Sequence, residues 1–388
     1  MVCVAIVINL KKNQMKKITL LAAFFACLVA FAEKMPDGYY QSADGKQDEE
    51  LKTALYNIIK VGSRQGYGSG SWTVFYYSDR REDGSVWDMY SDTVRYFTNP
   101  GTAVSGMNIE HSFAKSWWGG TKNDAYKDCY HLNPSESTAN SARSNYPLGV
   151  VTNVTKTAGS LKIGTNPEYK TLYPRKNGND FMIWEPKDEY KGDFARAYFY
   201  MATCYQDLTW RIDNDDVGSK FAMQNDNYLE FQEWEQQVLL DWHRMDPVSQ
   251  KEITRMDAVS DYQHNRNPFI DYPCLVEYIW GNKQGQKVDF KKLKNTADSD
   301  WLTSLDMSGC TCSSVDTKDN PAEAQIKINV EGKNIFIYGI NEDTEIKIYD
   351  ATGRLIIDAT ATQSPIRIVN SGFYLLQLPN KTHKILIP

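Results

Sequence analysis

The segment 108–145 gathers four kinds of side chain that together could hydrolyse a phosphodiester bond. They are the carboxylate of Glu110, the imidazole of His111, the carboxamide of Asn140 and the guanidinium of Arg143. This reaction requires that charge at phosphorus is neutralised, that water is activated and that the leaving oxygen is stabilised. Mg²⁺ prefers oxygen ligands and keeps several of its waters, so one carboxylate and one amide oxygen are enough to hold it. We therefore predict that Glu110 and Asn140 bind a metal ion.

The same segment supplies a candidate base and a candidate phosphate contact. A neutral histidine, with an unperturbed pKa of ~6.5, can take a proton from water near neutral pH, which makes His111 the expected general base. Arg143 is the first candidate to face the phosphate and Arg266 is the second. Both have a structural alternative: Arg143 could pair with Asp124 or Asp128, and Arg266 lies in an Asn- and Asp-rich stretch typical of a locked turn.

Two elements must position these groups. Neighbours in a regular strand face opposite sides, so Glu110 and His111 can serve one site only where their strand ends or twists. Asn140 falls in a short predicted helix over 135–142, with Pro134 at its first position and the preceding asparagine as its cap. A helix laid across two strands would bring Asn140 towards Glu110.

Three further residues are expected to bind substrate or to support those that do. They are His131, Asn145 and Arg266. For His131 we favour a structural role or one as a hydrogen-bonding partner behind the site, with substrate contact as the alternative.

The chain divides by composition into two domains joined by a linker. Residues 33–307 predict a mainly helical domain in which strands are few and short. Asp48 is a candidate helix cap, while 66–92 is expected to be loop with a short strand and 145–192 to be mainly irregular. Residues 308–320 have the composition of a linker, and 321–388 alternate apolar and polar residues between turns, as in a small all-β sandwich. Further helices are predicted over 194–205, 228–242 and 249–264.

The first 32 residues have the pattern of a signal peptide. Lys16 and Lys17 precede an apolar run over 18–31, which ends in small residues. Met15 opens this pattern and is an alternative start of the chain. An N-terminal membrane anchor is the rival interpretation, but the run is short for a membrane span. We expect an exported chain without stable membrane insertion.

Cysteine usage fits an exported protein with at least one unpaired thiol. Five of the seven cysteines follow the leader, and an odd number leaves one free or buried. Cys310 and Cys312 are too close for an easy mutual disulfide, so the pairing stays open among Cys129, Cys204, Cys274, Cys310 and Cys312.

The charge balance excludes binding of polyanions by bulk field. The first 32 residues carry four lysines and no acid, and 321–388 carry seven basic and seven acidic residues, so 33–320 have a net charge of −10. A nucleic acid would have to be held by a local basic groove and the metal.

Residues 38–282 resemble the endonuclease I family of secreted ββα-metal nucleases. The resemblance rests on Asn-Ile-Glu-His at 108–111, His-Leu-x-Pro at 131–134, Asn-x-x-Arg-Ser-Asn-Tyr-Pro-Leu-Gly at 140–149, and further matches at 38–40, 88–91, 242–248 and 265–271. It implies an α+β fold with a ββα-metal core within a mainly helical domain. It also implies Glu110 and Asn140 as metal ligands, His111 as base, Mg²⁺ or another divalent cation such as Mn²⁺ or Ca²⁺, and cleavage of DNA and RNA to leave 5′-phosphate ends.

Residues 321–388 are similar to the C-terminal sorting domain of type IX secretion. The similarity rests on 348–354, on Gly-Phe-Tyr at 372–374 and on the final Lys-Ile-Leu-Ile. It implies recognition by outer-membrane secretion machinery and a secreted or cell-surface location. A carbohydrate- or protein-binding sandwich is the alternative.

Taken together, the sequence predicts a secreted, monomeric, metal-dependent endonuclease with little sequence preference. The alternatives are a nuclease restricted to RNA and a surface adhesion protein with a degenerate nuclease domain. Intact Glu110, His111 and Asn140 argue against degeneracy.

Overall fold

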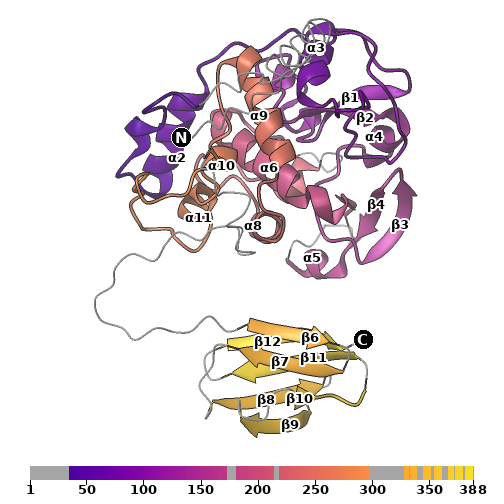
Figure 1. The fold of residues 1–388 in the computed structure, drawn as a ribbon, viewed down its shortest axis with the longest axis vertical. Coiled ribbons are helices and arrows are strands. Elements are labelled where there is room, and N and C mark those ends of the chain that lie inside the picture. Colours follow the sequence, from indigo (N-terminus) through magenta and orange to yellow (C-terminus); the bar gives the residue numbers. More distant parts are fainter. Residues whose placement is uncertain are drawn as a thin grey trace, which may run out of the picture. The chain divides into compact units, whose positions relative to one another are not determined.

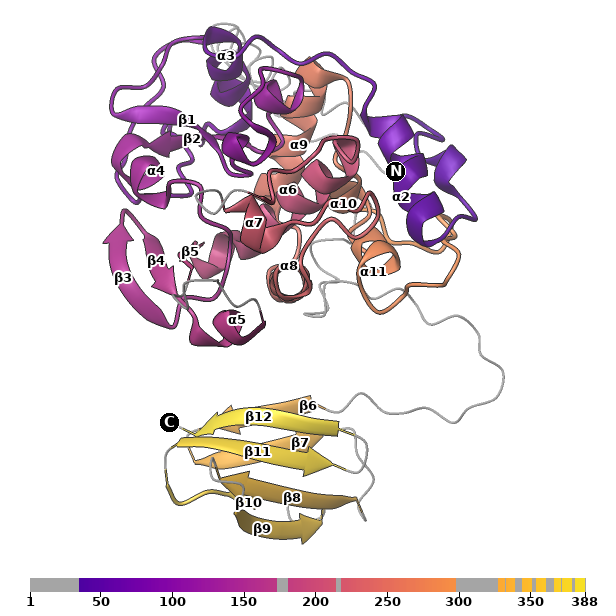
Figure 2. The same cartoon turned by 180° about the vertical axis from the view of Figure 1, so that it is seen from behind.

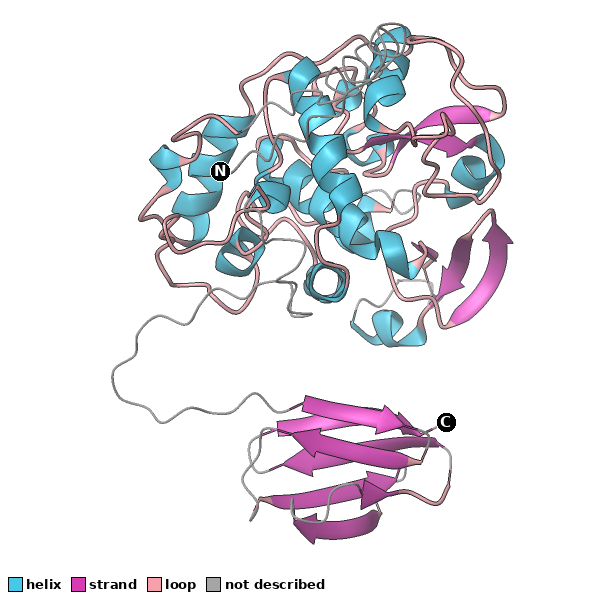
Figure 3. Ribbon diagram, viewed as in Figure 1, coloured by secondary structure: helices cyan, strands magenta, loops and turns pink. Residues whose placement is uncertain are grey.

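The computed structural model describes residues 35–172, 181–213 and 218–297, together with most strands of the C-terminal part between 327 and 387. The chain separates into two compact units between Ser313 and Ser314, within the segment expected to be a linker. The expected signal peptide, the 308–320 linker and both Cys310 and Cys312 lie outside the described residues. Helices predominate in the first unit and strands in the second (Figure 3), so the chain is of mixed α+β type.

A buried helix, α6 (Lys191–Cys204), forms the centre of the first unit. Nearly all of its residues are buried, as expected of a helix that is covered on every side. Helices α2 (Asp48–Ile59), α8 (Glu233–Met245) and α10 (Pro268–Asp271) pack against it, while α3 (Ser69–Ser78) packs against α9 (Gln250–Gln263) (Figures 1 and 2). The helical second half of this unit agrees with the prediction.

Helix boundaries show where local sequence signals worked. α9 begins where expected, because Ser249 and Glu252 form a reciprocal capping box. α8 starts at Glu233, five residues later than the predicted start at 228. Asp48 is the first residue of α2 and does not cap it; its carboxylate accepts the backbone N–H of Gly285 instead.

Two stretches expected to be loop or mainly irregular contain regular elements. The segment 66–92 contains α3, whose Trp72, Val74 and Phe75 are buried in the core. The segment 145–192 contains α5 (Pro167–Leu172) and an antiparallel sheet of β3 (Asn153–Ala158), β4 (Leu161–Thr165) and β5 (Ile183–Glu185). These elements were missed for two reasons: α3 is fixed by burial of its aromatic residues, whereas β3 is largely exposed and is held by its pairing with β4.

A two-stranded ribbon and one short helix carry the chemical segment. β1 (Met107–His111) pairs antiparallel with β2 (Leu132–Glu136), and α4 (Ser137–Arg143) follows directly. The predicted helix start was wrong: Pro134 lies in β2 opposite Ile109 and is not the first residue of the helix. A two-stranded ribbon tolerates proline because each of its strands is an edge strand. α4 packs on β1, β2, β3 and β4.

Shorter elements complete the first unit. They are the 3₁₀ turns η1 (Gln41–Ala43), η2 (Lys115–Trp118), η3 (Ala125–Lys127) and η4 (Asp188–Tyr190), and the helices α7 (Ser219–Ala222) and α11 (Leu275–Ile279). Cys129 and Cys204 are free and buried, and Cys274 is also buried. The odd cysteine count had predicted at least one such thiol. No helix among the described residues is long and apolar enough to cross a membrane.

The described strands of the C-terminal unit form two antiparallel sheets. One has the order β10-β7-β6 and the other β12-β11-β8-β9. Isoleucines of β7 and β8 and Leu376 of β11 share one hydrophobic core, so the two sheets pack on each other. The strands are β6 (Lys327–Glu331), β7 (Asn334–Tyr338), β8 (Glu345–Asp350), β9 (Leu355–Thr360), β10 (Ile366–Arg367), β11 (Gly372–Leu378) and β12 (Lys381–Ile387).

Candidate active site

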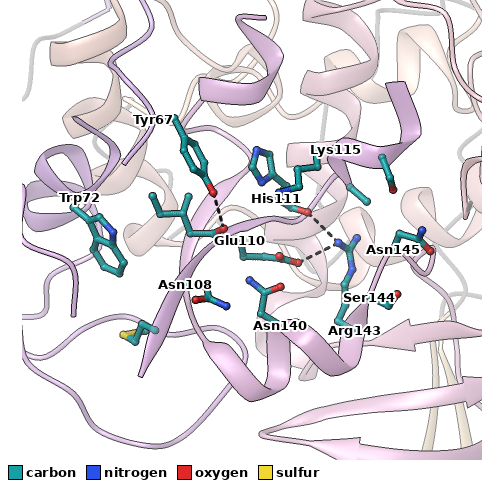
Figure 4. A pocket seen from close by; sticks show the side chains of 14 residues that line it. Tyr67, Trp72, Asn108, Glu110, His111, Lys115, Asn140, Arg143, Ser144 and Asn145 are labelled. Carbon is teal, nitrogen blue, oxygen red and sulfur yellow. Dashed lines mark hydrogen bonds and ion pairs between the residues drawn. The ribbon is translucent and has the colours of Figure 1, made fainter. Parts of the chain in front are cut away.

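A pocket of about 490 Å³ lies where β1 ends and α4 passes it (Figure 4). Its walls come from α3 and the residues before it, from β1 and the residues after it, and from α4 and the residues after it. Five of the seven predicted site residues line this pocket; His131 and Arg266 do not. The lining residues are Tyr67, Trp72, Met107, Asn108, Ile109, Glu110, His111, Ala114, Lys115, Ser116, Asn140, Arg143, Ser144 and Asn145.

The end of β1 resolves the difficulty of two neighbouring site residues. His111 is the last residue of the strand, and both Glu110 and His111 are buried. Strict alternation of faces applies only within a regular strand, so the two side chains can both reach the pocket at its end. In Figure 4 the Glu110 carboxylate lies beside Asn140 and Arg143, while the His111 ring lies beside Tyr67 and Lys115.

Glu110 is a buried carboxylate with one oxygen engaged by the protein. Its Oε1 accepts a hydrogen bond from the Tyr90 hydroxyl at 2.8 Å and from Arg143 Nη1 at 3.1 Å. Burial raises the pKa of Glu110, and the positive charge of Arg143 and the Tyr90 hydrogen bond oppose that rise. No described residue contributes a side-chain hydrogen bond to Oε2, which remains available for another partner.

Asn140 presents a carboxamide with no hydrogen-bond partner among the described residues. It is half-buried on α4, and its backbone carbonyl accepts the N–H of Ser144. Its side chain points into the pocket beside Glu110 (Figure 4). Asn108, on the exposed side of β1, is a further amide at the same wall.

The His111 ring has a defined tautomer. Its Nε2 lies 3.0 Å from the carbonyl oxygen of Tyr126. A carbonyl only accepts, so Nε2 carries the proton and Nδ1 is left with a lone pair. Burial, with help from the nearby His131 and Lys115, lowers the pKa of His111 to about 2, so the ring is neutral. The ring of Tyr67 stacks on it, with centroids 5.4 Å apart.

Arg143 is enclosed by protein acceptors. Besides Glu110, its Nη1 donates to the backbone carbonyl of His111 at 2.9 Å, and Nη2 donates to the carbonyl of Ser112 and to the Tyr198 hydroxyl. The residue is 1% exposed. The pairing expected as an alternative, with Asp124 or Asp128, does not occur; Glu110 takes that place.

His131 lies behind the pocket. It is fully buried, and its Nε2 donates to the carbonyl of Ala125 at 2.7 Å. Its own carbonyl accepts the backbone N–H and the hydroxyl of Ser112. These contacts connect β2 to the segment after β1.

Asn145 and Arg266 differ in position. Asn145 lines the pocket, and its backbone carbonyl accepts the indole N–H of Trp117 at 3.0 Å. Arg266 is buried away from the pocket and forms ion pairs with Asp257 and Asp271. The geometry of Arg266 is that of the locked turn, not of a phosphate contact.

Among the pocket residues that sequence reasoning did not single out, three offer a charge or an aromatic ring. Lys115 is an exposed ammonium group at the pocket wall, and Tyr67 and Trp72 contribute aromatic surface. Lys115 stands four residues after His111, and that closeness was the one available signal. Tyr67 and Trp72 reach the site only through the placement of α3, which the sequence did not reveal.

The donor set fits one hard divalent cation. Oxygen donors without a competing side-chain partner, Glu110 Oε2 and the Asn140 amide, open on the same pocket. Mg²⁺ is commonly held by one or two protein oxygens and several waters. No group of three or more His, Cys, Asp or Glu side chains in the described part of the chain could hold a metal ion, so an all-protein cage is not formed there.

Comparisons with known proteins find matches for both parts of the chain. A family model described as Endonuclease I matches residues 47–274, and one described as Secretion system C-terminal sorting domain matches residues 320–387. An extracellular ribonuclease of Bacillus amyloliquefaciens is 36% identical over 251 residues, covering 62% of this chain and 78% of that protein. An extracellular ribonuclease of Bacillus subtilis (strain 168) is 34% identical over 253 residues, covering 63% and 78%.

Both resemblances predicted from the sequence are thereby confirmed. The chain belongs to the Endonuclease I family and is a nuclease with a C-terminal secretion sorting domain, secreted or held at the cell surface.

Proposed function

We propose that this nuclease hydrolyses phosphodiester bonds of RNA and DNA with little sequence preference, using one divalent cation and His111 as general base, and leaves 5′-phosphate ends. The observation that carries the proposal is the meeting of Glu110, His111 and Asn140 at one pocket. In this proposal β1, β2 and α4 are the ββα-metal core of the family.

Glu110, through Oε2, and Asn140, through its amide oxygen, would hold the cation. When bound, Mg²⁺ or another divalent cation such as Mn²⁺ or Ca²⁺ neutralises charge on the scissile phosphate and stabilises the leaving oxygen. Tyr90 and Arg143 fix the other oxygen of Glu110, so that the carboxylate is oriented before a ligand arrives.

His111 removes a proton from the attacking water at Nδ1. The Tyr126 carbonyl holds the proton of Nε2, which keeps Nδ1 as the acceptor throughout. The ring enters the reaction in its neutral, basic form. A phosphate anion beside the ring raises its pKa, which favours proton uptake when substrate is bound.

The two cationic residues of the pocket, Arg143 and Lys115, have different proposed roles. Both terminal nitrogens of Arg143 are engaged by the protein, so we propose that it positions Glu110 and the end of β1 and does not contact the phosphate. Lys115 is exposed at the pocket wall and has no ion-pair partner among the described residues, so it is the better candidate to approach the phosphate.

Substrate breadth is the least constrained part of the proposal. The curated relatives are extracellular ribonucleases, which supports RNA as one substrate and keeps a nuclease restricted to RNA as the second candidate. The net charge of −10 over 33–320 means that either polymer must be held locally, at the pocket. The alternative of an adhesion protein with a degenerate nuclease domain is disfavoured, because Glu110, His111 and Asn140 line one pocket.

We further propose that the C-terminal unit is a small sandwich that directs the chain, as a monomer, to outer-membrane secretion machinery. Support comes from the match of the sorting-domain family model to residues 320–387 and from the shared core of the two sheets.

Digestion of plasmid DNA and of RNA by the purified chain, with Mg²⁺ or with EDTA, tests the proposed activity. His111→Ala should abolish cutting while the protein stays folded. His264→Asn is the matched control, because His264 is exposed at the end of α9, outside the pocket. Cutting that persists in EDTA, or in His111→Ala, would contradict the mechanism, and cutting of RNA alone would select the second candidate.

A further inference from the structure

An accessible aromatic ring stands at the mouth of the pocket. Tyr67 is 39% exposed and lines the pocket just before α3. One side of its ring packs on His111, at 5.4 Å between centroids and 23° between planes, and close to Tyr126 at 4.6 Å. Figure 4 shows the ring beside His111 at the pocket edge. A ring packed on one side and more than one-third exposed must offer much of its remaining surface to solvent.

The backbone around Tyr67 keeps this approach open. Gly66 and Gly68 flank it, and a Cβ built at either glycine meets no atom within 4 Å. Gly68 has a φ of 99°, in a region that side-chain-bearing residues rarely adopt. The two residues next to Tyr67 therefore have no side chain that could cover the ring.

The phenol is uncharged, and its hydroxyl interacts with Tyr126 and with the backbone of Ile109. Its hydroxyl lies 3.5 Å from the carbonyl of Ile109, at the limit of a hydrogen bond. Burial, assisted by the neighbouring Tyr126, raises the pKa of Tyr67 to about 12, so the ring stays neutral at neutral pH. A neutral, exposed aromatic face beside a phosphate-binding group has the chemistry that a nucleobase stacks on.

We propose that Tyr67 is the stacking platform for one unpaired nucleobase adjacent to the scissile phosphate. This rests on the proposed function, and it narrows the substrate class to nucleic acid in which that base is free of a helix, such as single strands and loops. A base inside a duplex already stacks on its neighbours and must be unstacked before it can reach the ring. The enzyme therefore cleaves single strands faster than a fully paired duplex of the same sequence.

The test uses an oligonucleotide with a single cleavable linkage. It is made of whichever polymer, DNA or RNA, the full chain digests. All linkages except the cleavable one are methylphosphonates. Three versions carry all bases, an abasic sugar on the 5′ side of the cleavable linkage, or one on its 3′ side. The measured quantity is kcat/KM for the wild type, Tyr67→Leu, Tyr67→Phe and Tyr77→Leu. Tyr77 is the control, because it is an exposed tyrosine of α3 that stacks on Tyr262 outside the pocket.

One abasic position should lower the wild-type kcat/KM about tenfold, the usual scale for loss of one base–aromatic stack. On the intact oligonucleotide, the kcat/KM of Tyr67→Leu should be about tenfold below that of the wild type. On the abasic oligonucleotide that slows the wild type, the two proteins should have nearly the same kcat/KM. Tyr67→Phe keeps the ring and should lose much less than Tyr67→Leu, and Tyr77→Leu should match the wild type.

Equal losses for Tyr67→Leu on intact and abasic oligonucleotides would overturn the proposal, since the residue would then act only by packing on His111. Abasic substrates cut as fast as the intact one would overturn it too. Neither result touches the proposed function, which fails separately if the wild type cuts no intact nucleic acid.

Discussion

His111 and His131, whose ring centroids are 5.5 Å apart, make the same kind of backbone contact but lie in different environments. Both are buried, and each donates its Nε2–H to a carbonyl of the η3 turn: His111 to Tyr126 and His131 to Ala125. They differ at the other nitrogen. Nδ1 of His131 is sealed without a hydrogen-bond partner in the described structure, whereas His111 lines the pocket. If His111 is the general base, as we propose, then access of Nδ1 to the pocket distinguishes it from His131, because burial and tautomer are the same in both.

The η3 turn, whose carbonyl oxygens accept both hydrogen bonds, is held in place by the residue that follows it, Asp128. The buried carboxylate of Asp128 accepts hydrogen bonds from Arg64 and from the hydroxyls of Tyr200 and Tyr205. Burial raises the pKa of Asp128, but Arg64 and these hydrogen bonds outweigh it, so the net pKa is lowered and the carboxylate stays charged. A fixed turn holds both imidazoles at fixed angles.

Exchange of each histidine for glutamine is expected to give the largest contrast. Glutamine can still donate to the turn carbonyl but cannot act as a base. His111→Gln should lower kcat by about 10²–10⁴-fold, the usual contribution of a general base. His131→Gln should lower it less than about tenfold. Steady-state RNA digestion measures both, and similar losses for the two variants would break the comparison.

Glu110→Ala is expected to be the next largest change. It removes the proposed cation-binding carboxylate and leaves Arg143 without its ion-pair partner, so activity should fall about 10²-fold or more, by analogy with loss of other transition-state groups. Excess metal should restore it only in part. Calorimetric titration with Mg²⁺ checks cation binding directly, and unchanged affinity in the variant would remove Glu110 from the proposed site. His131→Gln should bind Mg²⁺ as the wild type does.

The sealed histidine should matter more for stability than for rate. His131→Leu leaves the Ala125 carbonyl without its donor, which should cost about 1–3 kcal/mol of unfolding free energy. Glutamine at this position should recover part of that loss. Urea denaturation followed by tryptophan fluorescence measures the difference. Wild-type stability in the leucine variant would show that the contact is dispensable.

The same residue predicts a pH effect on stability. Burial lowers the pKa of His131 to about 4, below the ~6.5 of an unfolded histidine. Between these values the unfolded chain binds a proton that the folded chain refuses, so the contribution is full above pH 6.5 and lost as pH falls towards 4. The slope for one proton is about 1.4 kcal/mol per pH unit. The difference in unfolding free energy between wild type and His131→Gln should therefore shrink across this window, and a constant difference would contradict the assignment.

Lys115→Met should have the smallest effect. The lysine lines the pocket and acts electrostatically on His111, whereas the cations that act on His131 are the buried Arg143 and Arg255. Loss of one phosphate contact should reduce the slope of log affinity against log salt by about 1, with little change in kcat. Nucleic-acid binding over a salt series measures the slope. Lys122→Met, outside the pocket lining, is the control.

The sequence predicted which residues meet at the pocket better than it predicted the elements that carry them. Glu110, His111 and Asn140 follow from residue type and spacing, and the capping box of α9 follows from Ser249 and Glu252. The start of α4 did not, because a proline that is typical of a helix start also fits a two-stranded ribbon. The hydrogen-bond partners of Arg143 come from β1 and α6, which are far apart in the chain. No local sequence pattern therefore reveals that its guanidinium group is bound by protein acceptors.

The free thiols of Cys129 and Cys204 bear on where this unit can fold. Both are buried, and burial raises the pKa of each, to about 12 for Cys204, so they stay protonated and react slowly. At these two positions the fold is held by packing and by weak hydrogen bonds of the sulfur atoms, and it needs no oxidant. The native state of this region is therefore equally accessible in a reducing and in an oxidising compartment, before or after export.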